Sequence, residues 1–288
     1  MKALIFGAGG QVGSALRRRA PAGVTVAALS RAEAALTDPQ ACAARIAGAA
    51  ADLAINAAAF TAVDRAETQE PLATVINAAA PGAMAQAAAA RGLPFLQLST
   101  DYVFDGSGDR PWRPEDAPAP LNAYGRSKLA GEAAVRAAGG PHLILRTSWV
   151  FSAEGANFPR TMLRLAETRD ALDIVDDQVG GPTPADAIAD ALWTMAAALI
   201  RDARTGGTYH LSGAPDVSWA DFARAIFAQA GRAVTVTGIP SAAFPTAAPR
   251  PANSRLDCTR TARVFGIDRP DWRAGLARAL GDGAEGAT

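Results

Sequence analysis

The chain of 288 residues is 49% hydrophobic and 19% charged, a balance that lets it bury a large core without disulfides or a structural metal. Its 28 basic and 28 acidic residues cancel and are spread along the sequence, which argues against binding to nucleic acid or to an anionic membrane. No apolar run approaches the roughly 20 residues of a membrane span, and a strand pattern at Lys2 leaves no room for a signal peptide. Cys42 and Cys258 match no metal-ligand spacing and are expected to be buried free thiols, so we predict a cytoplasmic protein.

Short apolar runs alternate with helical patterns over the first half of the chain. Strands are expected at residues 2–6, 24–29, 52–56, 94–99 and 142–147. Helices are expected between them at residues 11–20, 38–48, 63–69, 71–91 and 122–138. This alternation is typical of a parallel sheet with crossover helices, so the sequence predicts a doubly wound, Rossmann-type α/β fold.

The rhythm loosens beyond about residue 150, where loops rich in Gly and Pro separate the elements. Helices are expected at residues 157–169, 185–201, 218–230 and 271–280, and strands at 172–175, 207–211 and 233–238. The pattern predicts a second, smaller mixed α/β domain that binds substrate. We assign residues 1–155, with part of 185–211, to a dinucleotide-binding domain, and residues 156–184 and 212–288 to the substrate-binding domain.

A glycine-rich loop follows the first expected strand and opens the first helix, with the sequence Gly7-Ala8-Gly9-Gly10-Gln11-Val12-Gly13. Glycines there allow a tight turn and a close approach of a pyrophosphate, while the helix N-terminus offers free N–H groups and a partial positive charge. The strand before the loop and the helix after it favour a dinucleotide site over a plain tight turn.

The second strand ends in Leu29-Ser30-Arg31, where related folds often carry an acid for the ribose 2′-hydroxyl. An arginine suits a 2′-phosphate better than a bare diol, so NADPH is favoured and NADH remains an alternative. Arg31 could equally be a solvated loop arginine.

Tyr124 and Lys128 are four residues apart on an expected helix, so both side chains can reach one ligand. A nearby ammonium favours phenolate, and we therefore expect Lys128 to lower the pKa of Tyr124 and make it a competent acid. Lys2 and Lys128 are the only lysines in a chain that otherwise uses arginine. A compact ammonium that binds ribose hydroxyls is a role that guanidinium fills poorly, which favours a catalytic pair over a chance match.

Several motifs along nearly the whole chain resemble the dTDP-4-dehydrorhamnose reductase family, within the extended short-chain dehydrogenases/reductases. Besides the glycine-rich loop, they are Asn56 to Asp64, Ser99 to Phe104, Pro120 to Gly125, Arg146 to Phe151, Asn157 with Phe158, Thr161 to Leu163, Asp177 with Gln178, Gly181 to Thr183, and Arg250 to Asp257.

The resemblance implies hydride transfer from a nicotinamide to carbon 4 of a nucleotide-linked keto-sugar. Tyr124 would protonate the carbonyl oxygen, Lys128 would hold the nicotinamide ribose, and Thr100 would hydrogen-bond the reacting oxygen. The cofactor would contact Gly7, Gly9, Gly10, Gln11, Val12, Gly13, Ser30, Arg31, Ala35, Leu36, Ala57, Ala58, Ala59, Thr61, Tyr124 and Lys128. The substrate would contact Val63, Thr100, Asp101, Tyr102, Trp149, Asn253 and Arg255.

Some of these residues also have structural readings. Val63 and Trp149 could be core residues, Tyr102 a packed aromatic and Asp101 a cap. For the nucleotide diphosphate, Arg255 is the candidate cation and Arg250 the weaker one.

The sequence departs from the family in two places. Ala35 stands where many relatives have an acid, so one adenosine contact is missing. Some members bind Mg²⁺ at a homodimer interface through acids, and Asp186 lies in about the right region without an assignable partner. We therefore predict no metal in the active site and leave an interface Mg²⁺ and a homodimer as possible.

Two other functions share parts of this pattern. A nucleotide-sugar 4-epimerase or 4,6-dehydratase would have the same fold, loop and Tyr/Lys pair, but such dehydratases need an Asp-Glu pair after the threonine, and Tyr102 takes the second place. A regulatory relative binds NADP as a non-catalytic subunit of methionine adenosyltransferase. Retention of Thr100, Tyr124 and Lys128 argues against that role.

Overall fold

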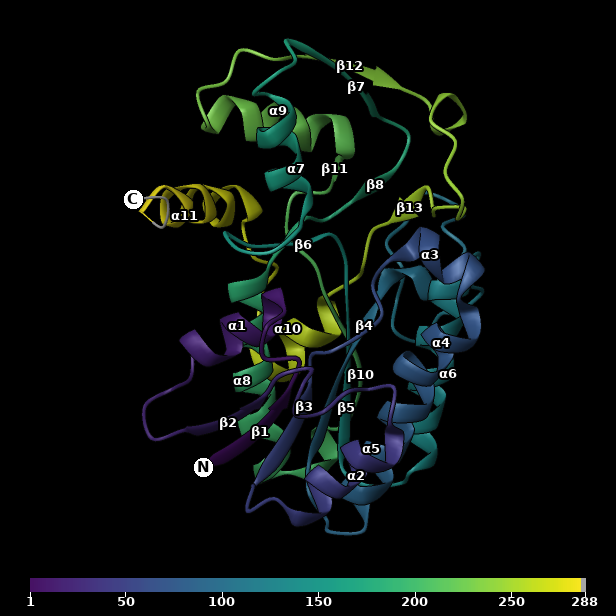
Figure 1. Ribbon diagram of the computed structural model, residues 1–288, viewed down its shortest axis with the longest axis vertical. Helices are drawn as coiled ribbons and strands as arrows, with labels where there is room; N and C mark the ends of the chain where they lie inside the picture. Colours follow the sequence, from purple (N-terminus) through teal and green to yellow (C-terminus); the bar gives the residue numbers. More distant parts are fainter. Residues whose placement is uncertain (286–288) are drawn as a thin grey trace.

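A parallel sheet of six strands forms the centre of the molecule (Figure 1), seen in a computed structural model that describes residues 1–285. The strand order is β10-β5-β4-β3-β1-β2. The strands are β1 Lys2–Phe6, β2 Thr25–Leu29, β3 Leu53–Asn56, β4 Phe95–Thr100, β5 His142–Thr147 and β10 Gly207–Leu211. The order reverses between β1 and β3, and in such sheets ligands bind outside the carboxyl ends of the strands at this point.

Helices cover both faces of this sheet. On one face, Leu16 of α1 and Ile188 of α8 share a core with Ile5 and Leu145. On the other, Ile46 of α2 and Met84 of α5 pack with strand residues that alternate with the first set. The helices of this half are α1 Gln11–Arg18, α2 Pro39–Gly48, α3 Val63–Thr68, α4 Glu70–Thr74, α5 Ala80–Ala89, α6 Ala123–Ala137 and α8 Ala185–Arg201.

The long helical stretch after β3 is interrupted. The sequence predicts helices at 63–69 and 71–91, and the structure divides this stretch into α3, α4, a π-helical turn at Val75–Ala79, and α5. Glycine lets α6 approach the turn, because a Cβ added at Gly131 would lie 2.0 Å from the carbonyl oxygen of Asn77. The π-helical turn therefore lies against the helix that carries Tyr124 and Lys128.

Most of the rest of the chain gathers at the carboxyl end of the sheet, in the upper part of Figure 1, whereas α10 (Thr259–Phe265) lies beside β10 and α8. Its core includes Phe151, Phe222 and Trp272. Its small sheets pair β7 with β12, β6 with β9, and β8 with both β11 and β13. The elements are β6 Val150–Phe151, α7 Phe158–Leu165, β7 Ala171–Val175, β8 Val179–Gly180, β9 Thr183–Pro184, β11 Val217–Ser218, α9 Trp219–Gln229, β12 Thr235–Ile239, β13 Asn253–Ser254, α10 Thr259–Phe265 and α11 Trp272–Glu285.

The predicted doubly wound α/β fold is confirmed. β10 pairs in parallel with β5, and α8 packs against α1, so this part of the chain belongs to the main sheet. The domain boundaries drawn from the sequence stay a prediction. Cys42 and Cys258 are both buried and free. No helix among residues 1–285 combines the length and apolar character needed to cross a membrane.

Candidate active site

Tyr124 lies in the first turn of α6, at the carboxyl end of the sheet. The Asn122 side chain caps this helix by accepting a hydrogen bond from the Gly125 N–H at 2.8 Å. A Cβ added at Gly125 would lie 2.2 Å from the carbonyl oxygen of Tyr102, so glycine lets the helix approach the turn that follows β4. The rings of Tyr102 and Tyr124 meet edge to face, with centroids 5.6 Å apart. The capped helix thus brings Tyr124 beside the end of β4.

Thr100 and Asp101 lie at this strand end, and both are buried. The Thr100 hydroxyl donates to the Asp101 carboxylate at 3.0 Å and accepts from the Tyr102 N–H at 3.2 Å. Burial raises the pKa of Asp101 to about 6, although hydrogen bonds with Ser254 and Thr100 oppose the shift. Asp101 Oδ2 has no hydrogen-bond partner among the described residues. The end of β4 is therefore followed by a carboxyl group that can still accept or share a hydrogen bond.

Burial also shifts the pKa values of Tyr124 and Lys128. Burial raises the pKa of Tyr124, and a hydrogen bond with Thr100 lowers it only in part. Lys128 donates from Nζ to the carbonyl oxygen of Leu98 at 2.6 Å. Burial lowers the pKa of Lys128 to about 8, with Glu132 raising it. Burial dominates the pKa of Tyr124, and the expected lowering of this pKa by Lys128 stays a prediction. The raised pKa keeps Tyr124 protonated at neutral pH, as a proton donor requires.

A buried ion pair joins α6 to strand β5. Glu132, one turn beyond Lys128, accepts from the Ser99 hydroxyl at 2.6 Å and from Arg146 Nε and Nη2 at 2.7 Å each. The side chains of Glu132 and Arg146 are 0% and 1% exposed. Burial opposes ionisation of Glu132, but the Arg146 guanidinium holds its pKa below the usual range. Glu132 therefore stays charged next to Lys128.

The glycine-rich loop has the shape that a pyrophosphate needs. Gly10 caps α1 without a side-chain hydrogen bond, which leaves the first N–H groups of the helix available. An added Cβ would meet nothing within 4 Å at Gly9, but would lie 2.7 Å from Ala58 at Gly7 and 2.0 Å from the Gly7 carbonyl at Gly13. Val12 is in the core. The loop thus has free space at Gly9 and close packing at Gly7 and Gly13, which fits the phosphates of a dinucleotide.

Gln11 connects the start of α1 to the segment after β6. Its side-chain oxygen accepts from Ser152 Oγ at 2.9 Å and from Asn157 Nδ2 at 3.0 Å. Asn157 also caps α7 by accepting from the Arg160 N–H. The two halves of the chain therefore meet directly beside the glycine-rich loop.

At the end of β2, Arg31 is exposed and Leu36 is buried. The Glu33 carboxylate, which the sequence reasoning missed, accepts from the Ser30 N–H at 2.8 Å and the Ser30 hydroxyl at 2.7 Å. Ala35 is half-buried and accepts from the Asp38 N–H through its carbonyl. Arg31 and Glu33 thus lie two positions apart in the segment predicted to bind the adenosine ribose, with opposite preferences for a 2′-phosphate.

Trp149 lies just beyond β5 in an uncommon conformation. Its φ of 47° falls in the left-handed region. Its indole stacks on Trp219 of α9 with centroids 3.5 Å apart and planes 9° apart. A Cβ added at Gly180 would come within 3.0 Å of the same indole. The structure holds this half-exposed aromatic side chain in place from two sides.

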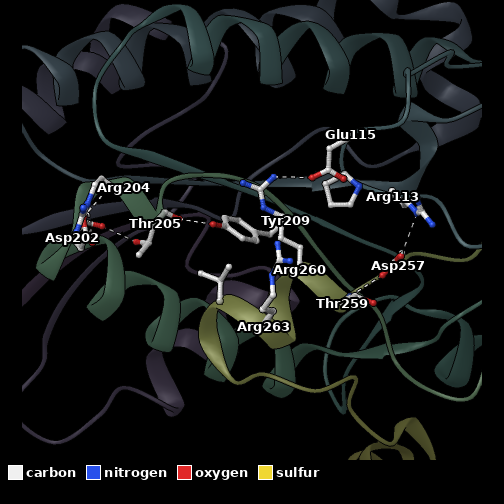
Figure 2. Close-up of a pocket in the computed structure, with 12 residues that line it drawn as sticks. Arg113, Glu115, Asp202, Arg204, Thr205, Tyr209, Asp257, Thr259, Arg260 and Arg263 are labelled. Carbon is white, nitrogen blue, oxygen red and sulfur yellow. Dashed lines mark hydrogen bonds and ion pairs between the residues drawn. The ribbon is translucent and has the colours of Figure 1, made fainter.

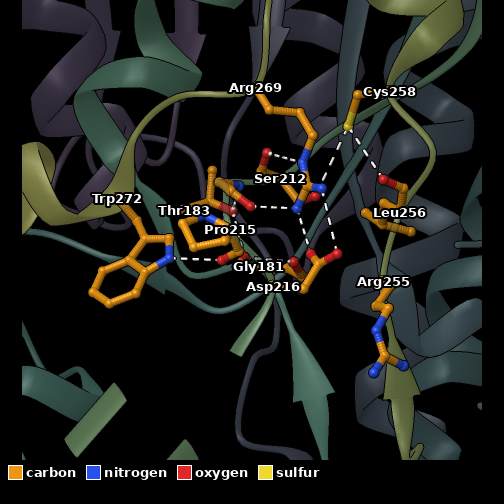
Figure 3. Close-up of polar contacts among 12 residues, drawn as sticks. Gly181, Thr183, Ser212, Pro215, Asp216, Arg255, Leu256, Cys258, Arg269 and Trp272 are labelled. Atoms are coloured by element: carbon orange, nitrogen blue, oxygen red, sulfur yellow. Dashed lines mark hydrogen bonds and ion pairs between the residues drawn. The ribbon is translucent and has the colours of Figure 1, made fainter. Parts of the chain in front are cut away.

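The two arginines considered for the nucleotide diphosphate, Arg250 and Arg255, have different hydrogen-bond partners. Arg250 pairs with Asp64 at the start of α3, next to Val63, so its guanidinium is already bound to a carboxylate. Arg255 Nη1 donates to the Asn253 side-chain oxygen at 3.1 Å. No acidic partner of Arg255 is found among the described residues. Figure 3 shows its guanidinium directed away from the ion pair of Arg269 with Asp216. Arg255 is therefore better suited to meet an anionic ligand.

Comparison with known proteins decides the family. A family model for the RmlD substrate binding domain matches residues 1–284. The dTDP-4-dehydrorhamnose reductase of Sinorhizobium fredii is 43% identical over 286 residues, covering 97% of each chain. The crystal structure of the Clostridium acetobutylicum reductase has a TM-score of 0.91 and 36% identity, covering 98% of this chain and 99% of the other. The Bacillus anthracis reductase, in complex with NADP, has a TM-score of 0.90 and 32% identity, with the same coverage.

The chain belongs to the dTDP-4-dehydrorhamnose reductase family. The family predicted from the motifs is therefore confirmed. The assignment of individual residues to catalysis and binding stays a prediction.

Asn77 is a further residue that matters for the site in this family member and that the sequence reasoning missed. It is buried in the π-helical turn, where its side chain accepts from the Phe60 N–H at 2.8 Å. It donates to the Phe60 carbonyl at 3.0 Å and to Ser127 Oγ at 2.9 Å. Asn77 thereby ties the loop after β3, which carries Ala57, Ala58, Ala59 and Thr61, to the helix of Tyr124.

A surface cavity of this reductase-family chain lies elsewhere. Figure 2 shows this cavity of about 780 Å³, whose lining includes none of the predicted site residues. Three of its arginines pair with acids: Arg204 with Asp202 at 2.9 Å, Arg260 with Glu115 at 3.0 Å, and Arg113 with Asp257 at 3.8 Å. The fourth arginine of the lining is Arg263, and the cavity holds none of the residues predicted for catalysis.

Asp186, considered above for an interface Mg²⁺, pairs with Arg18 at 2.6 Å. Among the side chains that the structure describes, no group of three or more His, Cys, Asp or Glu residues could hold a metal ion. An interface metal and a homodimer stay predictions for this family member.

Proposed function

We propose that this protein is an NADPH-dependent reductase that converts dTDP-4-dehydro-L-rhamnose to dTDP-L-rhamnose. The observation that carries the proposal is that Tyr124 and Lys128 of α6 bond to the end of β4, at Thr100 and at the Leu98 carbonyl, in a chain that belongs to this reductase family. The NADP complex of the Bacillus anthracis relative supports the choice of cofactor, and NADH remains the alternative.

The proposed chemistry uses each side chain in the state described above. NADPH, when bound, supplies the hydride that reduces carbon 4 of the sugar. Tyr124, kept protonated by burial, donates its proton to the carbonyl oxygen. Thr100 hydrogen-bonds the same oxygen and so stabilises the charge that develops there. Lys128, charged at neutral pH, holds the nicotinamide ribose and stabilises the phenolate left on Tyr124.

The cofactor site would run along the edge of the sheet from β2 to β5. Gly7, Gly9, Gly10, Gln11, Val12 and Gly13 would bind the pyrophosphate, mainly through main-chain N–H groups. Ser30, Arg31, Ala35 and Leu36 would contact the adenosine half. Arg31 would favour a 2′-phosphate, while Glu33 beside it would repel one, so the ratio of NADPH to NADH use depends on this pair.

The sugar and its nucleotide would lie between the end of β4 and the segments that precede α9 and follow β13. Val63, Asp101, Tyr102 and Trp149 would line the sugar pocket. Asn253 and Arg255 would meet the nucleotide diphosphate, which is supported by the Arg255 guanidinium, whose partner is the neutral Asn253 side chain and not a carboxylate. We also propose the two-domain division at the boundaries given above and action in the cytoplasm.

The test is NADPH oxidation with dTDP-4-dehydro-L-rhamnose, followed by identification of the product. Tyr124→Phe should still bind NADPH but lose rate by about 100-fold or more. An unchanged rate would remove Tyr124 from the mechanism. NADPH binding without turnover of any nucleotide 4-keto-sugar would instead favour the regulatory-subunit function, and loss of water from the sugar would favour a dehydratase.

A further inference from the structure

Two buried side-chain atoms have no hydrogen-bond partner among the described residues, and they lie close together in the fold. They are Asp101 Oδ2 and the hydroxyl of Thr147. Thr147 ends β5, and its register partner on β4 is Thr100, the residue before Asp101. It is only 6% exposed. Because buried hydroxyls nearly always have a partner, an unpaired one at the mouth of a site indicates contact with a ligand.

The strand register fixes the direction in which Thr147 points. The preceding pair, Ser99 and Arg146, bonds to Glu132 of α6 on one face of the sheet. Successive residues of a strand alternate between faces, so the Thr147 side chain lies on the other face. That is the face covered by α1, where Leu98 and Leu145 pack.

The same face carries the predicted pyrophosphate site. The glycine-rich loop opens α1, and Gln11 bonds to Ser152 and Asn157, a few residues after the end of β5. Thr147 therefore lies five residues before Ser152, which contacts Gln11, and it lies next to Thr100 at the carboxyl edge of the sheet.

The sheet order then predicts which end of the dinucleotide lies near Thr147, namely the nicotinamide. The predicted adenosine contacts follow β2, the glycine-rich loop follows β1, and β4 and β5 lie beyond β3 on the opposite side. A dinucleotide whose pyrophosphate lies at β1 and whose adenosine lies at β2 has its nicotinamide at β4 and β5.

We propose that the Thr147 hydroxyl hydrogen-bonds the carboxamide of the nicotinamide and so fixes the orientation of the ring. A hydroxyl can donate to the carboxamide oxygen or accept from its NH₂ group. The inference rests on the proposed function, since it takes NADPH as the ligand. It makes Thr147 a cofactor-binding residue that the family motifs did not assign.

Thr147→Val tests the proposal, because it removes the hydroxyl and nearly keeps the shape. Since this hydroxyl has no partner among the described residues, the variant should keep or raise its thermal midpoint. Thr147→Ser should keep wild-type affinity for NADPH. Thr183→Val is the matched control: Thr183 is also buried, but its hydroxyl donates to the Gly181 carbonyl at 3.0 Å and accepts from the Gly213 N–H at 3.2 Å (Figure 3). That control should lower the thermal midpoint.

The deciding measurement is cofactor binding without sugar, followed by the fluorescence of the reduced nicotinamide and by calorimetry. Thr147→Val should weaken NADPH binding about 3- to 10-fold, as expected for one neutral hydrogen bond. Its affinity for 2′-phospho-ADP-ribose, which has no nicotinamide, should match that of the wild type. If the wild type prefers NADH, the same comparison is made with NADH and ADP-ribose.

Equal affinities of Thr147→Val and wild type for NADPH would overturn the proposal, as would equal weakening for both ligands. A raised KM for the sugar with unchanged NADPH affinity would also overturn it, because the hydroxyl would then face the sugar. A wild-type protein that binds NADPH but reduces no keto-sugar would contradict the proposed function alone. The binding comparison would still decide the role of Thr147.

Discussion

Arg250 and Asp64 form a two-point ion pair, with Nη2 to Oδ2 at 2.8 Å and Nη1 to Oδ1 at 3.1 Å. Asp64 also accepts from the Ala248 N–H at 3.0 Å. The pair joins the segment before β13 to the start of α3, beside Val63. It is one link between the last part of the chain and the predicted sugar pocket, besides the hydrogen bond of Ser254 with Asp101.

Arg250→Gln should therefore raise KM for the nucleotide sugar several-fold and leave kcat nearly unchanged, because Val63 loses its support but the reacting groups do not. The loss of stability should stay below about 1 kcal/mol, since the Asp64 side chain is 46% exposed and screened by water. Steady-state kinetics and urea denaturation measure both effects. Arg224→Gln, which breaks the exposed pair with Asp221, is the control and should leave KM unchanged.

The pKa of Lys128, lowered by burial to about 8, predicts an alkaline limit for cofactor binding. The folded protein loses this proton at a lower pH than the unfolded chain, whose lysine pKa is about 10.4. This group therefore adds stability as pH rises from 8 to 10, while the site loses its ammonium. NADPH affinity, followed by fluorescence, should fall above pH 8. In Lys128→Met the affinity should be low and flat over that range; a wild-type decline that persists in this variant would assign the limit to another group.

The buried pair of Glu132 and Arg146 predicts a large loss of stability when only one partner is removed. Glu132→Gln leaves a buried guanidinium without its charge partner and should lower the free energy of unfolding by about 3–5 kcal/mol. The double change of Glu132→Leu with Arg146→Leu should cost less than Glu132→Leu alone and Arg146→Leu alone added together. Urea denaturation of the four proteins gives the coupling energy, and additive losses would contradict it.

Two glycines of the first loop predict opposite outcomes for the same substitution. Gly9→Ala should fold with wild-type stability, because its Cβ meets nothing within 4 Å, yet should bind NADPH poorly because the methyl group occupies the approach of the pyrophosphate. Gly13→Ala should be strongly destabilised, because its Cβ would lie 2.0 Å from the Gly7 carbonyl oxygen. Thermal melts with and without NADPH separate these effects; normal cofactor binding by Gly9→Ala would move the pyrophosphate elsewhere.

The features that could be predicted from the sequence are those set by local spacing. Tyr124 and Lys128 share a helix face whatever surrounds them, and the glycine-rich loop lies between the first strand and helix by its position alone. The strand ends that carry Thr100 and Arg31 follow from apolar runs of the right length.

The features that were missed depend on contacts between distant residues. Asn77 lies in an alanine-rich stretch that reads as a continuous helix, and its partners are 17 and 50 positions away. Arg250 and Asp64 are separated by 186 positions, so their contact depends on how the last part of the chain lies on the first. The effect of burial on the pKa of Tyr124 was missed for the same reason, because burial is a property of the whole fold.

The backbone of Trp149 has a consequence for attempts to engineer this enzyme. A non-glycine residue in the left-handed region costs about 1–2 kcal/mol, which glycine would avoid. Glycine would also remove the indole that stacks on Trp219, and truncating a packed aromatic side chain costs about 3–5 kcal/mol. Screens for heat resistance should therefore retain tryptophan at this position despite its backbone strain.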